Sequence, residues 1–143
     1  MTRRGFVILA AAAAVFGLGY WMGRERTVSA AGKGRVFELR TYTANEGKLD
    51  ALNARFRGHT VKIFEKHGMQ NIGYWTPMDA PQSQNTLIYV IAHKDREAAK
   101  KSWDAFRNDP DWKKVQSESE AAGKIVAKVE SVYMEPTDYS PMK

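Results

Sequence analysis

Residues 85–93 have the sequence NTLIYVIAH, a nearly continuous run of β-branched and aromatic side chains. Such a run is typical of a central strand that is covered on both faces, so it predicts the middle of a sheet. Residues 35–43, RVFELRTYT, alternate with a period of two, as a strand with two different faces does. Residues 69–76 and 124–134 complete the set of predicted strands.

Hydrophobic residues at steps of three to seven predict one long helix between the first two strands. We expect Asn45 to cap its start and Gly68 to end it in a left-handed conformation. A second helix follows residues 85–93, with Asp95 as its cap. Pro110 is expected in the first turn of a further short helix, where no backbone donor is needed.

The predicted order is strand, helix, strand, strand, helix, short helix, strand. Two such halves on one antiparallel sheet give an α+β, ferredoxin-like fold, a four-stranded sheet with the helices on one face. We expect Tyr42, Tyr89 or Trp75 to point away from the helices, on the bare face of the sheet. A bare aromatic face favours the pairing of two sheets in a dimeric α+β barrel, so the sequence predicts a homodimer.

Residues 1–30 have the parts of an export signal, with the pair Arg3-Arg4, an uncharged run at 5–23 and small residues near the end. The arginine pair followed by Phe6 resembles a twin-arginine signal, which directs folded proteins out of the bacterial cytoplasm. The alternative is that residues 5–23 remain as a membrane anchor, since about 20 apolar residues span a bilayer. Either interpretation predicts a periplasmic or otherwise exported bacterial protein, with membrane contact only if this segment is retained.

Composition limits the partners of the rest of the chain. Removing residues 1–30 removes four arginines and one glutamate, which lowers the net charge from +6 to +3. The remaining positive residues are spread among acids, so no nucleic acid partner is expected. The chain has no cysteine, and an apolar core must stabilise it. We expect one domain at residues 31–135, followed by a polar tail at residues 136–143.

Several motifs together resemble the NIPSNAP family. They are ELRTY at residues 38–42, FRGHT at 56–60, EKHG at 65–68, IGYW at 72–75 and NDPDW at 108–112, with Asn85 opening the third strand. The resemblance covers roughly residues 36–136 and implies a ferredoxin-like fold that pairs as a dimeric α+β barrel, without a common chemistry. Residues 77–83 depart from the usual acidic, glycine-containing turn, which weakens any site inferred on that loop.

The predicted ligand site begins with Glu38, Arg40 and Tyr42, which share one face of the first strand. If this face lines a cavity, Arg40 can bind a carboxylate in a bidentate manner. The alternative is that Arg40 forms a structural ion pair with Glu38, or lies in the dimer interface. His59 lies on the apolar stripe of the long helix and is expected to point toward the sheet, as a core residue or as a binding group. With the aromatic residues added, the predicted ligand-binding set is Glu38, Arg40, Tyr42, His59, Trp75 and Tyr89.

The other histidines and tryptophans are assigned to structure. His67 is expected to complement the negative end of the helix dipole, and His93 to lie at the surface or at a helix entry. Trp103 and Trp112 are assigned to packing. The three histidines are far apart and no dinucleotide or phosphate-loop motif occurs, so we expect neither a metal nor a cofactor.

These observations leave more than one function open. We expect an exported barrel that binds a small organic or anionic ligand, or a partner, without catalysis. The alternative is a cofactor-independent monooxygenase-like enzyme that acts in the barrel cavity, an interpretation that depends on analogy between folds. A third interpretation is a structural protein that docks others through its dimer or its tail.

Overall fold

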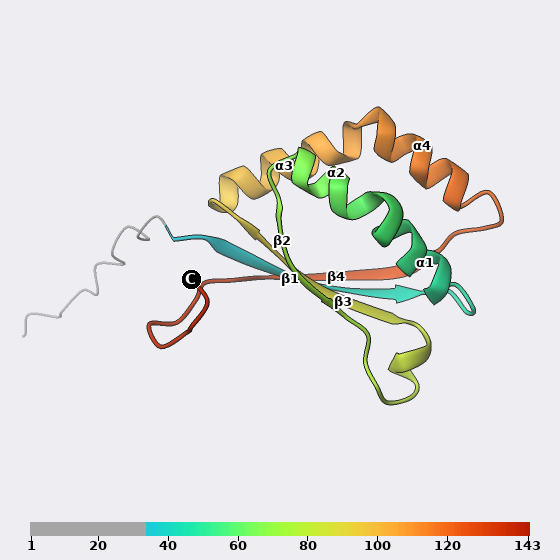
Figure 1. The fold of residues 1–143 in the computed structure, drawn as a ribbon, viewed down its shortest axis with the longest axis horizontal. Helices are drawn as coiled ribbons and strands as arrows, with labels where there is room; N and C mark the ends of the chain where they lie inside the picture. Colours follow the sequence, from blue (N-terminus) through green and yellow to red (C-terminus); the bar gives the residue numbers. More distant parts are fainter. Residues whose placement is uncertain (1–33) are drawn as a thin grey trace, which may run out of the picture. The chain divides into compact units, whose positions relative to one another are not determined.

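The computed structural model describes residues 34–143, and four antiparallel strands form one sheet within this range (Figure 1). The order across the sheet is β2-β3-β1-β4. The strands are β1 (Val36–Ala44), β2 (Gln70–Trp75), β3 (Thr86–His93) and β4 (Val126–Met134). β1 and β3 are central, which confirms the predicted ferredoxin-like, α+β arrangement. The predicted export signal at residues 1–30, with its anchor alternative at 5–23, lies outside the described residues.

The helices of the described region cover one face of the sheet (Figure 1). The first helical segment consists of α1 (Leu49–Arg55), a π-helical turn η1 (Phe56–Thr60) and α2 (Val61–Lys66). α3 (Arg96–Asn108) and α4 (Pro110–Ser119) follow β3, and a short 3-10 turn η2 (Gln82–Gln84) precedes it. None of these helices has the length and apolarity needed to cross a bilayer.

The π-turn η1 changes which side chains of the first helical segment face the sheet. A regular α-helix would turn His59 inward, four residues before Ile63. The wider π-turn instead places Phe56 and Thr60 in the interior, with Phe64 after them, and leaves His59 exposed. The prediction that His59 points toward the sheet is therefore wrong.

The helix boundaries are partly as predicted. The Asp95 carboxylate accepts a hydrogen bond from the Ala98 amide at 2.7 Å, which confirms the predicted cap of α3. Pro110 opens α4, as expected, and Gly68 follows α2 with a φ of +75°. Asn45 does not cap α1; its side-chain amide donates to the Lys124 carbonyl instead, at 2.8 Å.

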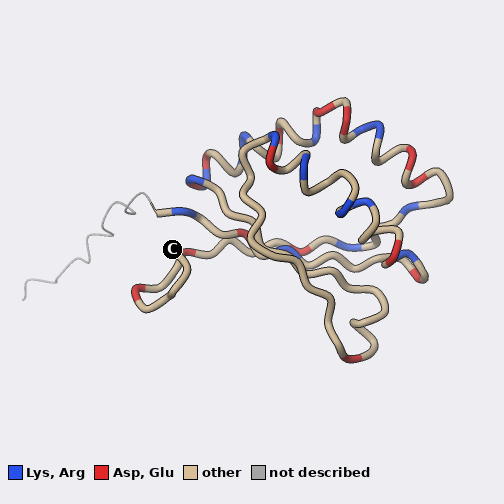
Figure 2. Tube along the Cα trace, viewed as in Figure 1, with Lys and Arg blue, Asp and Glu red and all other residues tan. Residues whose placement is uncertain are grey.

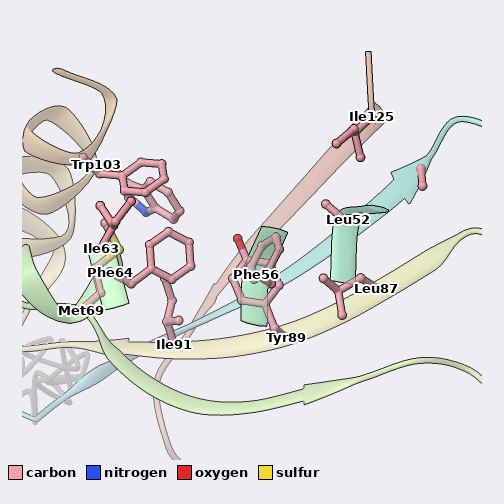
Figure 3. Packing of buried hydrophobic residues seen from close by; sticks show 12 residues of the cluster. Leu52, Phe56, Ile63, Phe64, Met69, Leu87, Tyr89, Ile91, Trp103 and Ile125 are labelled. Carbon is pink, nitrogen blue, oxygen red and sulfur yellow. The ribbon is translucent and has the colours of Figure 1, made fainter. Parts of the chain in front are cut away.

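The core between the sheet and the helices combines aliphatic residues with a group of contacting aromatic rings (Figure 3). Tyr89, at the centre of β3, is completely buried, and its ring lies 5.2 Å from that of Phe56 and 5.9 Å from that of Phe64. Tyr42 also faces the helices, 5.8 Å from Phe56. The prediction that these two tyrosines could lie on the bare face is therefore wrong. Both belong to the strand face that alternation assigns to Glu38, and that face is covered by helices.

The opposite face of the sheet carries apolar side chains that no described helix covers. Leu39 is paired with Val90 on one side and with Val132 on the other, so the three lie in one row across the sheet. Trp75 belongs to this face, as predicted, and 53% of its surface is exposed. The polar tail after β4 lies against one end of this face, where Met142 lines a shallow apolar groove together with Phe37.

Candidate functional site

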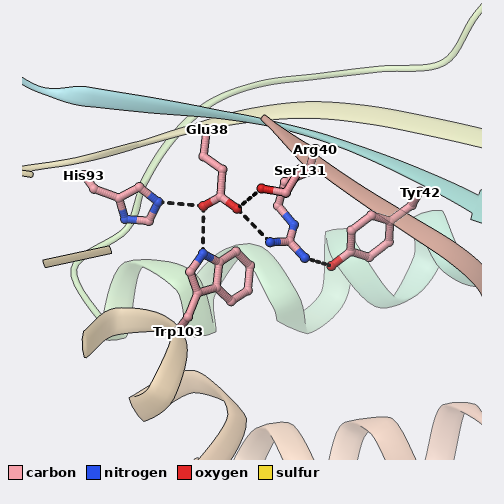
Figure 4. A network of polar contacts seen from close by, with 6 residues as sticks. All are labelled: Glu38, Arg40, Tyr42, His93, Trp103 and Ser131. Atoms are coloured by element: carbon pink, nitrogen blue, oxygen red, sulfur yellow. Dashed lines mark hydrogen bonds and ion pairs between the residues drawn. The ribbon is translucent and has the colours of Figure 1, made fainter. Parts of the chain in front are cut away.

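The side chain of Glu38 lies at the centre of a buried polar network between the sheet and α3 (Figure 4). One carboxylate oxygen accepts hydrogen bonds from His93 Nε2 at 2.9 Å and from Trp103 Nε1 at 2.7 Å. The other oxygen accepts from Arg40 Nη1 and from Ser131 Oγ, both at 2.7 Å. Four donors from β1, β3, β4 and α3 therefore surround one carboxylate.

The electrostatics of this network favour the charged form of Glu38. Burial by itself raises the pKa of the carboxyl group, but the hydrogen bonds from His93, Ser131, Trp103 and Arg40 outweigh it and lower the pKa to about 2. The pKa of Arg40 is raised: burial opposes the rise, while Tyr42, Tyr89 and Glu38 promote it. At neutral pH, Glu38 and Arg40 form a fully ionised pair in the interior.

Arg40 is held on several sides, in agreement with the alternative in which it is an ion-pair partner of Glu38. Its guanidinium carbon lies 4.1 Å from the ring centroid of Trp103. Its Nη2 donates a long hydrogen bond, 3.5 Å, to the hydroxyl of Tyr42. Arg40 therefore contacts Glu38, Trp103 and Tyr42, while its Nε has no hydrogen-bond partner among residues 34–143.

Three members of the network were not among the predicted site residues. His93 was expected at the surface, but it is 2% exposed and bonded to Glu38. Trp103 was assigned only to packing, yet its indole N–H is one of the four donors. Ser131 lies opposite Arg40 in the pairing of β1 with β4. The sequence signal for it was a polar residue on the otherwise apolar side of an alternating strand.

An aromatic cleft of about 350 Å³ lies next to this network, between β1, β4 and the helices. Its rings pack against one another: Phe56 meets Phe64 edge-on with centroids 6.0 Å apart, and the rings of Phe106 and Trp112 are tilted by 32° with centroids 4.5 Å apart. The lining includes Tyr42, Arg55, Phe56, Thr60, Phe64, Phe106, Trp112, Gln116, Glu120, Lys124, Lys128 and Val129.

A second arginine, Arg55 at the end of α1, lines the aromatic cleft directly. Its Nη1 donates to Glu120 Oε1 at 3.1 Å and to Ser119 Oγ at 3.3 Å. Its guanidinium carbon lies 5.2 Å from the centroid of the Trp112 ring. The side chain is only 3% exposed, which is unusual for a charged group at a cavity wall.

The structure brings together some of the predicted site residues and separates others. Glu38, Arg40 and Tyr42 form one connected row, and Tyr42 extends it into the aromatic cleft. Tyr89 packs beneath them in the core. The remaining two lie elsewhere: His59 lines a separate outer groove beside α4, and Trp75 is on the opposite face of the sheet.

A second polar cluster joins the end of α2 to the junction of α3 and α4. Asp109 is buried and accepts contacts from Lys66 Nζ at 2.9 Å and from His67 Nε2. The ammonium of Lys66 and the His67 ring hold the pKa of Asp109 well below its usual range. His67, expected to complement the helix dipole, thus forms a specific contact between helical segments.

The chemical capacity of the site follows from these contacts. The four hydrogen bonds to the Glu38 carboxylate leave it poorly suited to accept a proton from a substrate. In residues 34–143, no three histidine, aspartate or glutamate side chains are grouped as a metal site would require. The lining of the aromatic cleft is about equally polar and apolar, so the arrangement is suited to a molecule that has both an apolar body and polar groups.

Comparison with solved structures places this fold among known ones. A NIPSNAP family protein with unknown function from Agrobacterium tumefaciens is similar with a TM-score of 0.67 and 19% identity, covering 78% of this chain and 96% of that chain. A NIPSNAP-like domain protein from Burkholderia xenovorans gives a TM-score of 0.65 and 16% identity, with 76% and 90% coverage. SnoaB, a cofactor-independent oxygenase from Streptomyces nogalater, is similar with a TM-score of 0.51 and 11% identity; the match covers 76% of this chain and 98% of SnoaB.

At these identities the structures are evidence for the fold alone. No match was found among curated proteins. The NIPSNAP family model matches residues 37–141, which includes all four strands and the helices between them. This match over most of the sequence confirms the resemblance carried by the motifs, and the chain belongs to the NIPSNAP family.

Proposed function

We propose that this protein binds a small organic ligand, with an apolar body and polar groups, in the aromatic cleft. The observation that carries the proposal is the cleft itself: about 350 Å³ of space between the sheet and the helices, lined by aromatic rings and by polar side chains. Ligand cavities in proteins are commonly of this size and are lined mainly by apolar groups with a few polar ones. Tyr42, held by Arg40, is one such polar group.

The network beneath the cleft supports a preformed site. Glu38 connects β1, β3, β4 and α3, so the strand and the helix that carry cleft residues are held in one geometry. Rings that are fixed before binding lose little freedom when a ligand enters, which favours affinity. Binding therefore needs no rearrangement of the core.

The alternative is an enzyme that resembles the cofactor-independent monooxygenases. The similarity to SnoaB supports a shared fold, and a fold does not determine a reaction. Glu38 is linked to the cleft only through Arg40 and Tyr42, and its carboxylate accepts four hydrogen bonds. We therefore favour binding, and oxygen consumption with a quinol substrate would favour the enzyme.

We also propose that the protein is exported and works as a homodimer. Export is supported by the arginine pair and the uncharged run in residues 1–30. Dimerisation is supported by the apolar row Leu39, Val90 and Val132 on the helix-free face. The ligand-binding proposal does not depend on either.

The test uses a matched pair of variants on α4 in the full-length chain. Gln116 is exposed and lines the aromatic cleft, whereas its neighbour Ser117 is exposed and does not. We expect phenylnaphthylamine (NPN), an uncharged aromatic fluorophore, to bind the wild type and the Ser117→Trp variant alike. The Gln116→Trp variant should lose this binding, because the new ring fills the cleft. Equal binding to both variants, or no binding to the wild type, would refute the proposal.

A further inference from the structure

We infer that the ligand of the aromatic cleft carries an acidic group, which Arg55 binds. This inference rests on the proposed function, and it assigns the ligand class: an amphipathic organic anion with an aromatic or alicyclic body. It also assigns the anion-binding role to Arg55 and not to Arg40, the arginine suggested by the sequence.

The first reason is the hydrogen-bonding state of Arg55. Its guanidinium is more than nine-tenths buried, and only Nη1 donates to Ser119 and Glu120. The buried Nε has no hydrogen-bond partner among residues 34–143. Nearly all buried polar atoms in proteins are hydrogen-bonded, so an unpaired buried donor at a cavity wall marks a position where a ligand acceptor would gain free energy.

The second reason is the geometry of the guanidinium group. A carboxylate, sulfonate or phosphate can bind side-on to the Nε edge of an arginine while Nη1 remains bonded elsewhere. Glu120 could therefore keep its contact with Arg55 when a ligand binds. The Nε of Arg40 is also buried without a hydrogen-bond partner, but Arg40 does not line the cleft, and Glu38, Tyr42 and the Trp103 ring surround its guanidinium.

The third reason is the charge around the opening of the cleft. Lys124 lines the same cavity as Arg55, and Glu120 is the acidic residue among the lining side chains. Lys128 also borders the cavity, but the strand register places its side chain on the helix-free face, where its ammonium pairs with Glu130 at 2.9 Å. Arg55 and Lys124 against Glu120 leave an excess of positive charge at this end of the cleft, which favours an anion over a cation. The aromatic rings of Phe56 and Trp112 supply the surface for the apolar body.

The experiment compares two probes that share one skeleton. Anilinonaphthalene sulfonate (ANS) carries a permanent negative charge, and NPN has the same rings without the sulfonate. We expect the full-length chain to bind ANS more tightly than NPN by about tenfold, the lower range for a charge-assisted contact. Arg55→Gln should abolish this preference while leaving NPN binding within about twofold.

Two further variants make the outcome specific. Arg57→Gln removes the same charge from an exposed position on η1 and should leave the preference intact. Glu120→Gln removes the negative charge that partly neutralises Arg55, so it should raise the affinity for ANS and not for NPN. This second variant decides the question if Arg55→Gln fails to fold.

The results separate this inference from the proposed function. If NPN binds in the cleft but ANS shows no preference, or if Glu120→Gln leaves ANS binding unchanged, the anion inference is wrong and the binding function stands. If Arg55→Gln and Arg57→Gln reduce the preference equally, general charge explains it and Arg55 has no special role. If neither probe binds, or Gln116→Trp does not block them, both proposals fail.

Discussion

Glu38 carries a negative charge where water does not reach, and four donors compensate for that burial. Removing either the carboxylate or its donors lowers the free energy of unfolding by several kcal/mol, because the groups that remain are buried without a partner and without water. The network therefore helps to hold α3 in its position on the sheet, through the hydrogen bond from Trp103 to Glu38. Tyr42 in the cleft depends on the same network through Arg40.

The first prediction concerns the pH dependence of this residue. The pKa of Glu38 is about 2 in the folded state against 4.5 for an ordinary glutamate, so its stabilisation is present above pH 4.5 and is lost as the pH falls toward 2. Between about pH 5 and pH 3, the unfolding free energy of the wild type should fall by about 2 kcal/mol more than that of the Glu38→Gln variant, which has no carboxyl group at this position. Urea unfolding at about pH 5 and pH 3 measures this difference.

At neutral pH, Glu38→Gln should unfold with a free energy lower by about 3 kcal/mol. The control is Glu97→Gln on α3, because the Glu97 side chain is 80% exposed and its ion pair with Lys101 is long, at 3.6 Å. That variant should change stability by less than about 0.5 kcal/mol at either pH. A gap between wild type and Glu38→Gln that stays constant from pH 5 to pH 3 would contradict the charged state of Glu38.

At the scale of elements, the π-turn η1 determines the wall of the aromatic cleft. It directs Phe56 and Thr60 inward, and the hydroxyl of Thr60 donates to the Arg55 carbonyl at 3.3 Å. Arg55 lies immediately before this turn. Such turns insert an extra residue into a helix and often occur at functional sites, which agrees with its place beside the cleft.

The second prediction compares two glycines that differ only in backbone conformation. A Cβ atom added at Gly58, in η1, or at Gly47, before α1, would meet no atom within 4 Å. Gly47 has a φ of +67°, whereas Gly58 does not have a positive φ. Gly58→Ala should therefore stabilise the protein by about 0.5–1 kcal/mol, and Gly47→Ala should destabilise it by about 1 kcal/mol.

Chemical denaturation of both variants beside the wild type provides the measurement. A loss of stability for Gly58→Ala would mean that η1 requires glycine for a reason other than space, and the account of this turn would be wrong. Binding of NPN should be unchanged in Gly58→Ala, because Gly58 is exposed and does not line the cleft.

At the scale of the whole molecule, the two faces of the sheet differ. The helices cover one face, and along them positive and negative residues are interspersed (Figure 2). The other face presents the apolar row with Trp75 beside it. An apolar face of this kind is stabilised when a second copy covers it.

The third prediction tests this face with two valines on β4. Val132 is 55% exposed and lies on the helix-free face, whereas Val129 is 43% exposed and lines the aromatic cleft on the other face. Val132→Lys should convert the dimer to a monomer, because it places a charge in the interface. Val129→Lys should leave the dimer intact. Sedimentation velocity at micromolar concentration measures both, and a wild-type monomer would remove the dimer proposal.

The fourth prediction concerns export of the precursor. The double substitution Arg3→Lys and Arg4→Lys keeps the charge of residues 1–30 and removes the two guanidinium groups that a twin-arginine pathway recognises. We expect the substituted precursor to accumulate in the cytoplasm of a bacterial host with that pathway. Export and processing equal to the wild type would show that the signal is of another class.

The sequence by itself determined the fold of this protein. Period-two alternation at residues 35–43 and the apolar run at 85–93 correctly predicted the two central strands, because alternation and burial follow directly from strand geometry. Asp95 and Pro110 marked helix starts for equally local reasons. The family motifs confirmed the same arrangement.

Only the tertiary structure decided which face of the sheet holds the site. Alternation places Glu38, Arg40 and Tyr42 together, but it does not say whether helices or a second sheet lie above them. One π-turn moved His59 outward, since a helix with an extra residue rotates every position after it. His93 and Trp103 joined Glu38 because they lie on segments far apart in sequence, and contacts of that kind form only when the sheet and α3 pack together.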